Sequence, residues 1–479
     1  MVVATANGAG YRYGVSDQAF YIPVVVRALD PNAFPRDASL IDAQGQLMLS
    51  DEALAGVVRT TGWSLDWVFL GTYLASMVLV WGGLSLIGSR VYRHGWTTAA
   101  LVAAFTLRHR ITRTSANSLE PYFHPRMLAF GLGLLALAAI LRRRTLLAVA
   151  LVGGAAAVHV TTGLWFALLA GVAIVILDRR WRTALLPLAA LGLAVAVWVL
   201  ATGLLRGRLE TMDGVWLQAV ASKDSLFASQ WPPRAWIANL GLVAVLWLAH
   251  LQRRRLGRAT PEDAALVWGT TALAAVFLVT LPAVSAGVAL FVQLQIPRVF
   301  WLVDVVATIY AVGVVAETSA STIRRAVVLA TILGAVAIGR GVYIMLVERP
   351  DRALFAVHLP NDAWQDANAW LARQGRTTHV LADPGHGWKF GTSVRVASEL
   401  DVLIEEVKDS AVAIYSRNVA TRLVDRTAAI GDFSALTAER ARELARRYDL
   451  DYLVTVAEMP LPEAYRNAQF RVYSLSGAP

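Results

Sequence analysis

The segment TLLAVALVGGAAAVHVTTGLWFALLAGVAIVIL, residues 145–177, indicates the class of fold. It holds no charged side chain and is longer than the roughly 20 residues that cross a bilayer as one helix. Gly153-Gly154 and the run from His159 to Gly163 interrupt it. We therefore predict a hairpin of two membrane helices, at about 145–159 and 161–177.

The composition of the whole chain also indicates a membrane protein. Of its 479 residues 56% are hydrophobic and 16% charged, and the mean hydropathy is +0.51. A soluble protein keeps about 25% of its residues charged, which excludes an ordinary soluble enzyme. The absence of cysteine excludes disulfides, zinc–cysteine sites, iron–sulfur clusters and thiol nucleophiles.

On both sides of the hairpin, further apolar runs are bounded by charged residues. Together with the hairpin they predict ten membrane segments, several of them shorter than a full span. They lie at about 66–88, 96–107, 127–141, 145–159, 161–177, 183–204, 235–250, 264–281, 298–316 and 326–347. The proline-broken stretch from Pro282 to Pro297 is read as a re-entrant or interfacial piece.

Short basic loops between these segments predict the orientation. If the segments alternate strictly, every second loop is basic, which is typical of cytoplasmic loops. These loops contain Arg90 and Arg93, Arg142–Arg144, Arg179–Arg182, Arg253–Arg255, and Arg324 and Arg325. Residues 1–65, 108–126, 205–234, 282–297 and everything after about 348 then lie outside. This placement of the arginines accounts for the net charge of +10 without a nucleic-acid partner.

The domain prediction has three parts. Residues 1–65 form an extracytoplasmic N-terminal loop region that includes the remnant of a first membrane helix, which would be an eleventh. Residues 66–349 form the transmembrane domain, and residues 350–479 form a small extracytoplasmic α/β domain.

The α/β prediction for the C-terminal domain rests on alternating helix and strand patterns. Its helices are expected from Asn361 or Asp362 to Gln374 and near 413–427 and 437–448, and its strands at 378–381, 451–457 and 470–475. Asp383 and His386 are read as part of a polar turn rather than as a site.

Asp17 is the leading catalytic candidate, in the run from Tyr11 to Pro23 before the first complete membrane segment. A carboxylate near the membrane surface, flanked by aromatic residues such as Tyr21, suits a base that deprotonates an acceptor hydroxyl. The simpler interpretation is that Asp17 caps a helix over Gln18–Leu29.

An arginine-rich loop at residues 108–126 breaks the pattern, because alternation places it outside. Arginine offers planar, permanently charged donors to the phosphate of a lipid-linked donor. Contact with anionic lipid headgroups would explain the same residues. The candidates are Arg108, Arg110, Arg113 and Arg126, with His124-Pro125 preceding Arg126 at the start of a membrane segment.

Three further polar residues lie at or near membrane depth. His159 sits at the outer end of the hairpin, where polar groups are functional candidates, although a carbonyl partner would also explain it. Arg298 lies at the outer interface and Asp304 nearly two turns deeper. The eight histidines are scattered without an i,i+4 pair or an HExxH motif, so a metal site has weak support.

This layout resembles the GT-C class of membrane glycosyltransferases. The resemblance rests on the aromatic-flanked Asp17 in the first outside loop, the many membrane helices of uneven length and the soluble C-terminal domain. The stretches Ser118–Arg126, His159–Trp165 and Gln295–Trp301 look like those of uncharacterised bacterial membrane proteins of the same architecture.

The resemblance implies a polyprenyl-phosphate-linked sugar donor, membrane lipids as surroundings, and an acceptor outside the plasma membrane of a bacterium. It maps the acidic residue of the first loop onto Asp17, with Glu120 in reserve as the base. Asp17-Gln18 stands where many members have two adjacent acids, which argues against a metal-assisted reaction. The alternative function is a non-catalytic polytopic protein, such as a lipid or polysaccharide transporter or an envelope-assembly partner.

Overall fold

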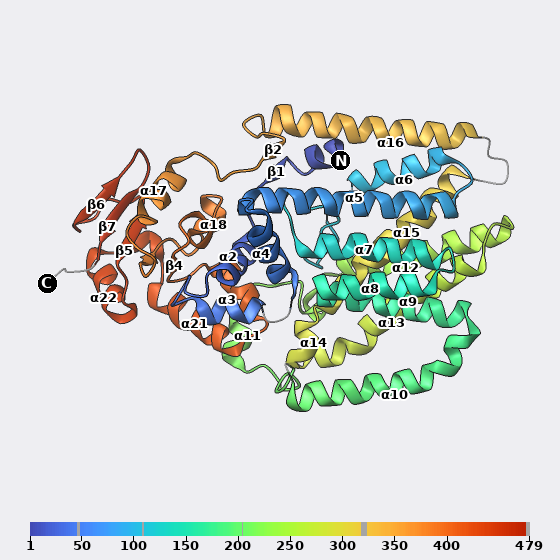
Figure 1. Ribbon diagram of the computed structural model, residues 1–479, viewed down its shortest axis with the longest axis horizontal. Helices are drawn as coiled ribbons and strands as arrows, with labels where there is room; N and C mark the ends of the chain where they lie inside the picture. The colour runs from blue at the N-terminus through green and yellow to red at the C-terminus, as the bar shows by residue number, and fades with distance from the viewer. Residues whose placement is uncertain (46–47, 108–109, 204, 318–322, 476–479) are drawn as a thin grey trace. The chain divides into compact units, whose positions relative to one another are not determined.

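The computed structural model in Figure 1 describes residues 1–45, 48–107, 110–203, 205–317 and 323–475. The chain divides into two compact units. Unit 1 contains residues 1–11, 72–212 and 223–354, and unit 2 contains residues 12–71, 213–222 and 355–479. The N-terminal segment 12–71 therefore belongs to the same unit as the C-terminal region.

Unit 1 is a bundle of helices. Its elements are α1 (Val2–Asn7), α5 (Leu65–Val91) from Thr72 onward, α6 (Gly95–Leu107), α7 (Pro125–Ile140), α8 (Thr145–Val158), α9 (Val160–Leu177), α10 (Arg179–Thr202), η1 (Ala228–Gln230), α12 (Pro233–Arg255), α13 (Pro261–Ser285), α14 (Ala289–Gln293), η2 (Ile296–Arg298), α15 (Val299–Ala316), α16 (Ile323–Tyr343) and the π-helical turn η3 (Ile344–Glu348). Each of the ten predicted membrane segments falls on one of these helices.

Six spans among the described residues are long and apolar enough to cross a membrane. They are Leu65–Val91, Val160–Leu177, Pro233–Arg255, Pro261–Ser285, Ala289–Ala316 and Ile323–Glu348. Shorter apolar helices, including α6, α7 and α8, accompany them. The prediction of a polytopic, mostly helical membrane protein with a small C-terminal sheet region is confirmed.

The predicted hairpin is also confirmed, and His159 marks its break. The backbone of His159 is extended between α8 and α9, and its side chain caps α9. A Cβ on Gly163 would stand 2.3 Å from the Cα atom of Ala156, so glycine is required where the two helices approach. One detail differs from prediction: α13 continues through Pro282 to Ser285, and the irregular stretch begins only after it.

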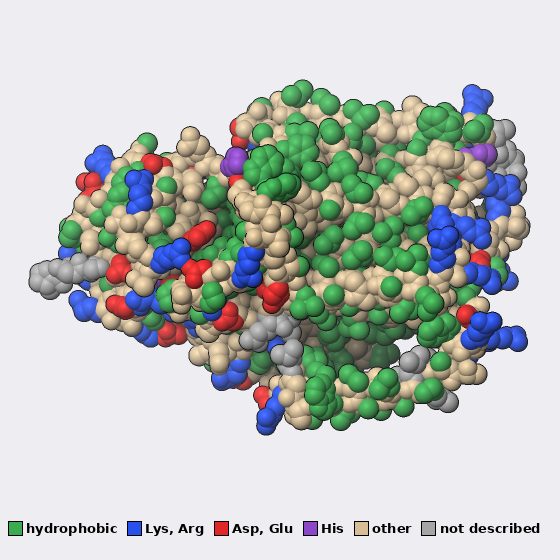
Figure 2. Space-filling view, in the orientation of Figure 1, with side chains coloured by type: hydrophobic (Ala, Val, Ile, Leu, Met, Phe, Trp, Pro, Cys, Tyr) green, Lys and Arg blue, Asp and Glu red, His purple; other side chains and the backbone are tan. Residues whose placement is uncertain are grey.

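Two of the basic loops, at Arg90 and at Arg142, lie side by side in unit 1. Arg90 Nε donates to the Leu141 carbonyl at 3.1 Å, and Arg142 Nη2 donates to the Leu86 carbonyl at 2.8 Å. The Glu317 carboxylate accepts from the backbone N–H of Arg93 at 3.0 Å. Figure 2 shows Lys and Arg side chains gathered at the right-hand end of this unit, beside a surface rich in hydrophobic side chains.

Unit 2 combines short helices with a five-stranded sheet. Its helices are α2 (Gln18–Leu29), α3 (Ala38–Gly45), α4 (Ser50–Thr61), α11 (Gly214–Val220), α17 (Ala363–Leu371), α18 (His386–Lys389), α19 (Val394–Ala397), α20 (Glu406–Ala413), α21 (Arg417–Ile430), η4 (Phe433–Ala435) and α22 (Ala438–Tyr448). The sheet strands are β3 (His379–Leu381), β4 (Asp401–Val402), β5 (Tyr452–Thr455), β6 (Glu463–Arg466) and β7 (Arg471–Ser474). The two short strands β1 (Tyr11–Arg12) and β2 (Phe355–Ala356) lie outside this sheet.

The sheet has the order β4-β3-β5-β7-β6. β3 pairs in parallel with β4 and β5, whereas β7 runs antiparallel to both β5 and β6. Trp364, Val380, Val454 and Phe470 belong to one buried cluster on this sheet. Asp362 caps α17 by accepting from the Gln365 N–H, as its position predicts.

The sequence patterns missed the shortest elements of unit 2. Strands β4 and β6 and helices α18–α20 were not predicted, and the helix expected at 413–427 occupies 417–430. Elements of two to eight residues give too few repeats for a period to emerge.

Candidate functional site

The arginine-rich loop forms one wall of a cavity in unit 1. The loop folds back on itself through a bridge between Ile111 and Ala116. Arg113 and Ser115 have positive φ values of 55° and 50° within this turn. Asn239 of α12 donates to the Thr112 carbonyl at 3.0 Å, so the loop is attached to that helix.

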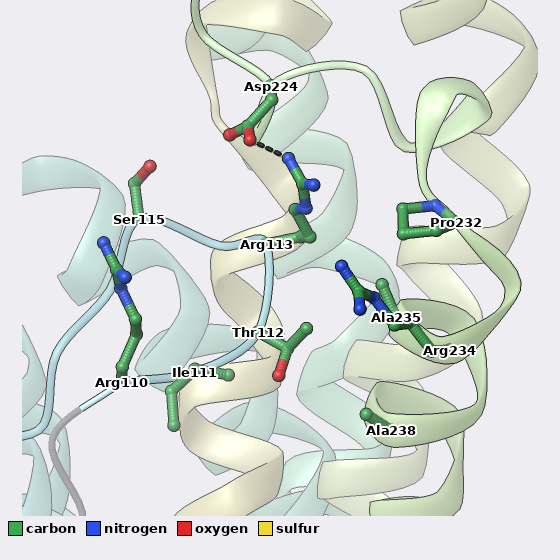
Figure 3. Close-up of a pocket in the computed structure, with 10 residues that line it drawn as sticks. All are labelled: Arg110, Ile111, Thr112, Arg113, Ser115, Asp224, Pro232, Arg234, Ala235 and Ala238. Carbon is green, nitrogen blue, oxygen red and sulfur yellow. Dashed lines mark ion pairs between the residues drawn. The ribbon is translucent and has the colours of Figure 1, made fainter.

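The cavity has a volume of about 650 Å³. Arg110, Arg113 and Arg234 line it, together with Asp224. Figure 3 shows Arg113 directed at Asp224, with which it forms an ion pair, and Arg234 reaching from the start of α12 toward the loop. Three guanidinium groups and one carboxylate line the cavity, so its lining has a net positive charge that suits a phosphate group.

Arg234 was not predicted as a site residue, although the sequence contains a signal for it. The dipeptides Pro125-Arg126, Pro233-Arg234 and Pro297-Arg298 stand at or just before the starts of α7, α12 and α15. Proline suits the first helical position, but arginine at the positive end of a helix dipole is unfavourable. A repeated unfavourable placement indicates a use for the charge.

Arg126 does not line this cavity. Its Nη2 donates to the Glu120 carboxylate at 2.7 Å, and each of the two side chains is only 3% exposed. Asn117 donates to both Glu120 oxygens at 3.1 Å. Glu120 and Arg126 therefore form a buried ion pair, and of the predicted arginines only Arg110 and Arg113 are brought together at the cavity. Arg108 lies outside the described residues.

Two histidines lie next to this ion pair. The Arg126 N–H donates to Nδ1 of His124 at 3.0 Å, and the Thr162 N–H donates to Nδ1 of His159 at 3.3 Å. An accepting Nδ1 in a neutral imidazole places the proton on Nε2. The ring centroids are 6.2 Å apart, so the histidines cap α7 and α9 side by side.

Aromatic packing and charge surround this histidine pair. Trp301 stacks on Phe130 at 4.1 Å and lies beneath the Arg126 guanidinium at 5.8 Å. Arg126 and Arg298 both act electrostatically on His159. The structure thus brings Glu120, His124, Arg126, His159 and Arg298 into one neighbourhood, while Asp304 is fully buried in α15.

Asp17 and Tyr21 belong to unit 2. Asp17 occupies the N-cap position of α2, but its side chain makes no capping hydrogen bond. Its Oδ1 instead accepts from Lys408 Nζ of α20 at 2.8 Å. The capping interpretation of this side chain is therefore wrong. Tyr21 is buried, with its ring edge-on to Phe20 at 6.2 Å.

A buried ionic network holds α20 in the same unit. Asp37 Oδ2 accepts from Arg395 Nε at 2.7 Å, and Arg395 Nη1 donates to Asp409 at 2.6 Å. Burial opposes ionisation of Asp37, but Arg395 and Arg422 outweigh it and hold the pKa of Asp37 below its ordinary value. Because Asp409 follows Lys408, this network positions the lysine that reaches Asp17.

In the part of the chain that the structure describes, no three His, Asp or Glu side chains lie close enough together to hold a metal ion.

The fold is that of a polytopic, mostly helical membrane protein. The structure is similar to that of the arabinofuranosyltransferase AftD from mycobacteria, with a TM-score of 0.51 and 14% sequence identity. The similarity covers the whole of this chain but 39% of the AftD chain, so the chain spans well under half the length of that enzyme. The sequence itself matches no protein-family model and no curated protein.

Proposed function

We propose that this protein is a membrane glycosyltransferase that takes a sugar from a polyprenyl-phosphate-linked donor and transfers it to an extracytoplasmic acceptor. The observation that carries the proposal is the 650 Å³ cavity lined by Arg110, Arg113 and Arg234 in a GT-C-like membrane fold. A lipid-linked phosphate presents its negative charge at headgroup level, where such a cavity would meet it.

The arginines would act on the leaving group. As the bond between the anomeric carbon and the phosphate oxygen breaks, the electron pair leaves with the lipid phosphate. Guanidinium groups stabilise that growing negative charge by bidentate, charge-assisted hydrogen bonds. Asp224, paired with Arg113, reduces the net positive charge of the cavity.

Asp17 would act on the acceptor. The acceptor oxygen forms the new bond to the anomeric carbon, and its proton passes to the Asp17 carboxylate. A positioned base contributes about 10²- to 10⁴-fold to such a step. Lys408 Nζ donates to Asp17 Oδ1 at 2.8 Å and would hold the carboxylate in position for this step.

The proposal includes a location and a sugar. The protein would lie in the plasma membrane of a bacterium, with residues 1–65 and 350–479 outside and 66–349 as the transmembrane domain. Because the similar structure is an arabinofuranosyltransferase, an arabinofuranosyl lipid is the first donor to test and a mannosyl lipid the second.

The test is a transfer assay in proteoliposomes with these two radiolabelled polyprenyl-phosphate sugars and a neutral oligosaccharide acceptor. We expect transfer by the wild type and at least about tenfold weaker donor binding by Arg234→Ala, from loss of a charge-assisted contact. Arg255→Ala is the matched control, because Arg255 is an exposed arginine at the other end of α12. Equal donor binding by both variants would indicate that the arginines contact lipid headgroups rather than the donor phosphate. Absence of transfer would favour a transporter or an assembly partner.

A further inference from the structure

Trp388 is a large aromatic side chain exposed on the C-terminal part of unit 2. It is 66% exposed on α18, and among the described residues from 355 onward Val456 is the other large hydrophobic side chain so exposed. Single exposed aliphatic residues are common, but a large exposed aromatic residue beside polar groups is informative.

The surroundings of Trp388 are polar and charged. Lys408 Nζ lies over its ring at 5.8 Å and over the Phe20 ring at 5.2 Å. The Lys408 side chain is 7% exposed and pairs with Asp17, which is 30% exposed. A carboxylate, an ammonium group and two aromatic rings therefore meet at one point of unit 2.

The turn that carries Trp388 is firmly held. His386 is fully buried, its Nδ1 hydrogen-bonds the Asp383 carbonyl at 2.8 Å, and its Nε2 accepts from the Val394 N–H at 3.2 Å. The Glu406 N–H donates to the Pro384 carbonyl at 3.0 Å, which ties the turn to the start of α20. The backbone that carries the exposed ring is therefore held in place, which lowers the cost of ordering this turn around a ligand.

From this arrangement we infer that Trp388, Phe20 and the Asp17–Lys408 pair form a binding subsite for a neutral saccharide, the acceptor of the proposed transfer. The exposed indole offers a flat apolar surface for the C–H face of a sugar ring. Asp17 and Lys408 offer hydrogen-bond partners for its hydroxyl groups. The inference rests on the proposed function only in identifying the bound saccharide as the acceptor. Saccharide binding itself needs no donor.

A membrane surface is the rival occupant, since tryptophan also gathers at lipid headgroups. The structure favours the saccharide. Insertion of Trp388 into lipid would bring the partly exposed Asp17 carboxylate toward an apolar medium, and that costs free energy that a polar sugar does not impose.

The experiment measures binding of fluorescently labelled arabino- and manno-oligosaccharides to the full chain in nanodiscs, without any lipid-linked donor. We expect Trp388→Ala to weaken binding at least about tenfold, as truncation of a central aromatic anchor does. Trp388→Phe should retain most of the affinity. Trp63→Ala is the matched control, because Trp63 is similarly exposed in unit 2 at 61%.

Wild-type affinity in Trp388→Ala, or binding of neither oligosaccharide to the wild type, would overturn the inference. A second measurement tests the rival. Because the chain has no cysteine, Trp388→Cys can be labelled with a polarity-sensitive dye, and quenching of that dye by nitroxide lipids would also overturn it. Saccharide binding without transfer activity would contradict the proposed function but would still support a saccharide subsite at Trp388.

Discussion

The carboxyl group of Asp17 has one observed partner and one proposed role, and mutations can separate the two. It pairs with the nearly buried Lys408 at 2.8 Å, and we propose that it is the catalytic base. Asp17→Asn should lower transfer at least about 100-fold. It should also destabilise unit 2 by about 1–3 kcal/mol, because Lys408 loses its charged partner.

A double variant separates these two effects. Asp17→Asn with Lys408→Met replaces the broken pair by neutral groups, and replacement of both partners costs little. We expect it to recover the thermal stability but not the activity. A fully active double variant would show that Asp17 is not the catalytic base.

Arg126 and Glu120 form the most buried ion pair among the predicted site residues. Arg126→Ala should therefore lower the free energy of unfolding by about 3–5 kcal/mol, because it leaves Glu120 buried and uncompensated. Arg110→Ala should leave stability nearly unchanged, since Arg110 lines the cavity. Denaturation of both variants in detergent checks this; equal stability would contradict the structural role of Arg126.

His379 should make unit 2 sensitive to acid. Burial lowers the pKa of His379 to about 4. The unfolded chain therefore binds more protons than the folded chain between pH 6.5 and pH 4. As a result, the free energy of unfolding decreases as the pH falls from 6.5 to 4. The loss should reach about 3 kcal/mol.

Thermal unfolding of the full chain from pH 7.5 to 4.5 measures how stability depends on pH, and the His379→Gln variant is measured for comparison. Burial and the neighbouring Asp37 raise the pKa of Asp401 to about 6, which gives a slope of opposite sign. Asp401 is present in both proteins, so the difference between them isolates His379. The variant should show a smaller loss toward low pH; identical profiles would count against the prediction.

At the scale of the elements, close packing of α7 on α9 depends on Gly133. A Cβ at this position would stand 2.2 Å from the ring of Phe166. Gly133→Ala should therefore destabilise unit 1 by about 1–3 kcal/mol through overpacking. Gly171→Ala in α9, where nothing lies within 4 Å of the added Cβ, is the control and should be neutral or slightly stabilising.

At the scale of the whole molecule, the basic loops predict the membrane topology. If they are cytoplasmic, the C-terminal region is outside, since strict alternation separates them. Reporter fusions at residues 255 and 479 should then report opposite sides of the membrane. The same side for both would contradict the orientation and the extracytoplasmic site.

The sequence by itself determined the membrane class, the ten helical segments and the hairpin at His159, because hydropathy and charge act locally along the chain. It also identified Asp17 and the arginine loop as sites of interest. It did not identify Lys408, 391 positions from Asp17, nor separate the cavity-lining Arg110 and Arg113 from the paired Arg126. Only the tertiary structure decided these, because a side chain's partner depends on which elements packing brings together, and no local pattern records that.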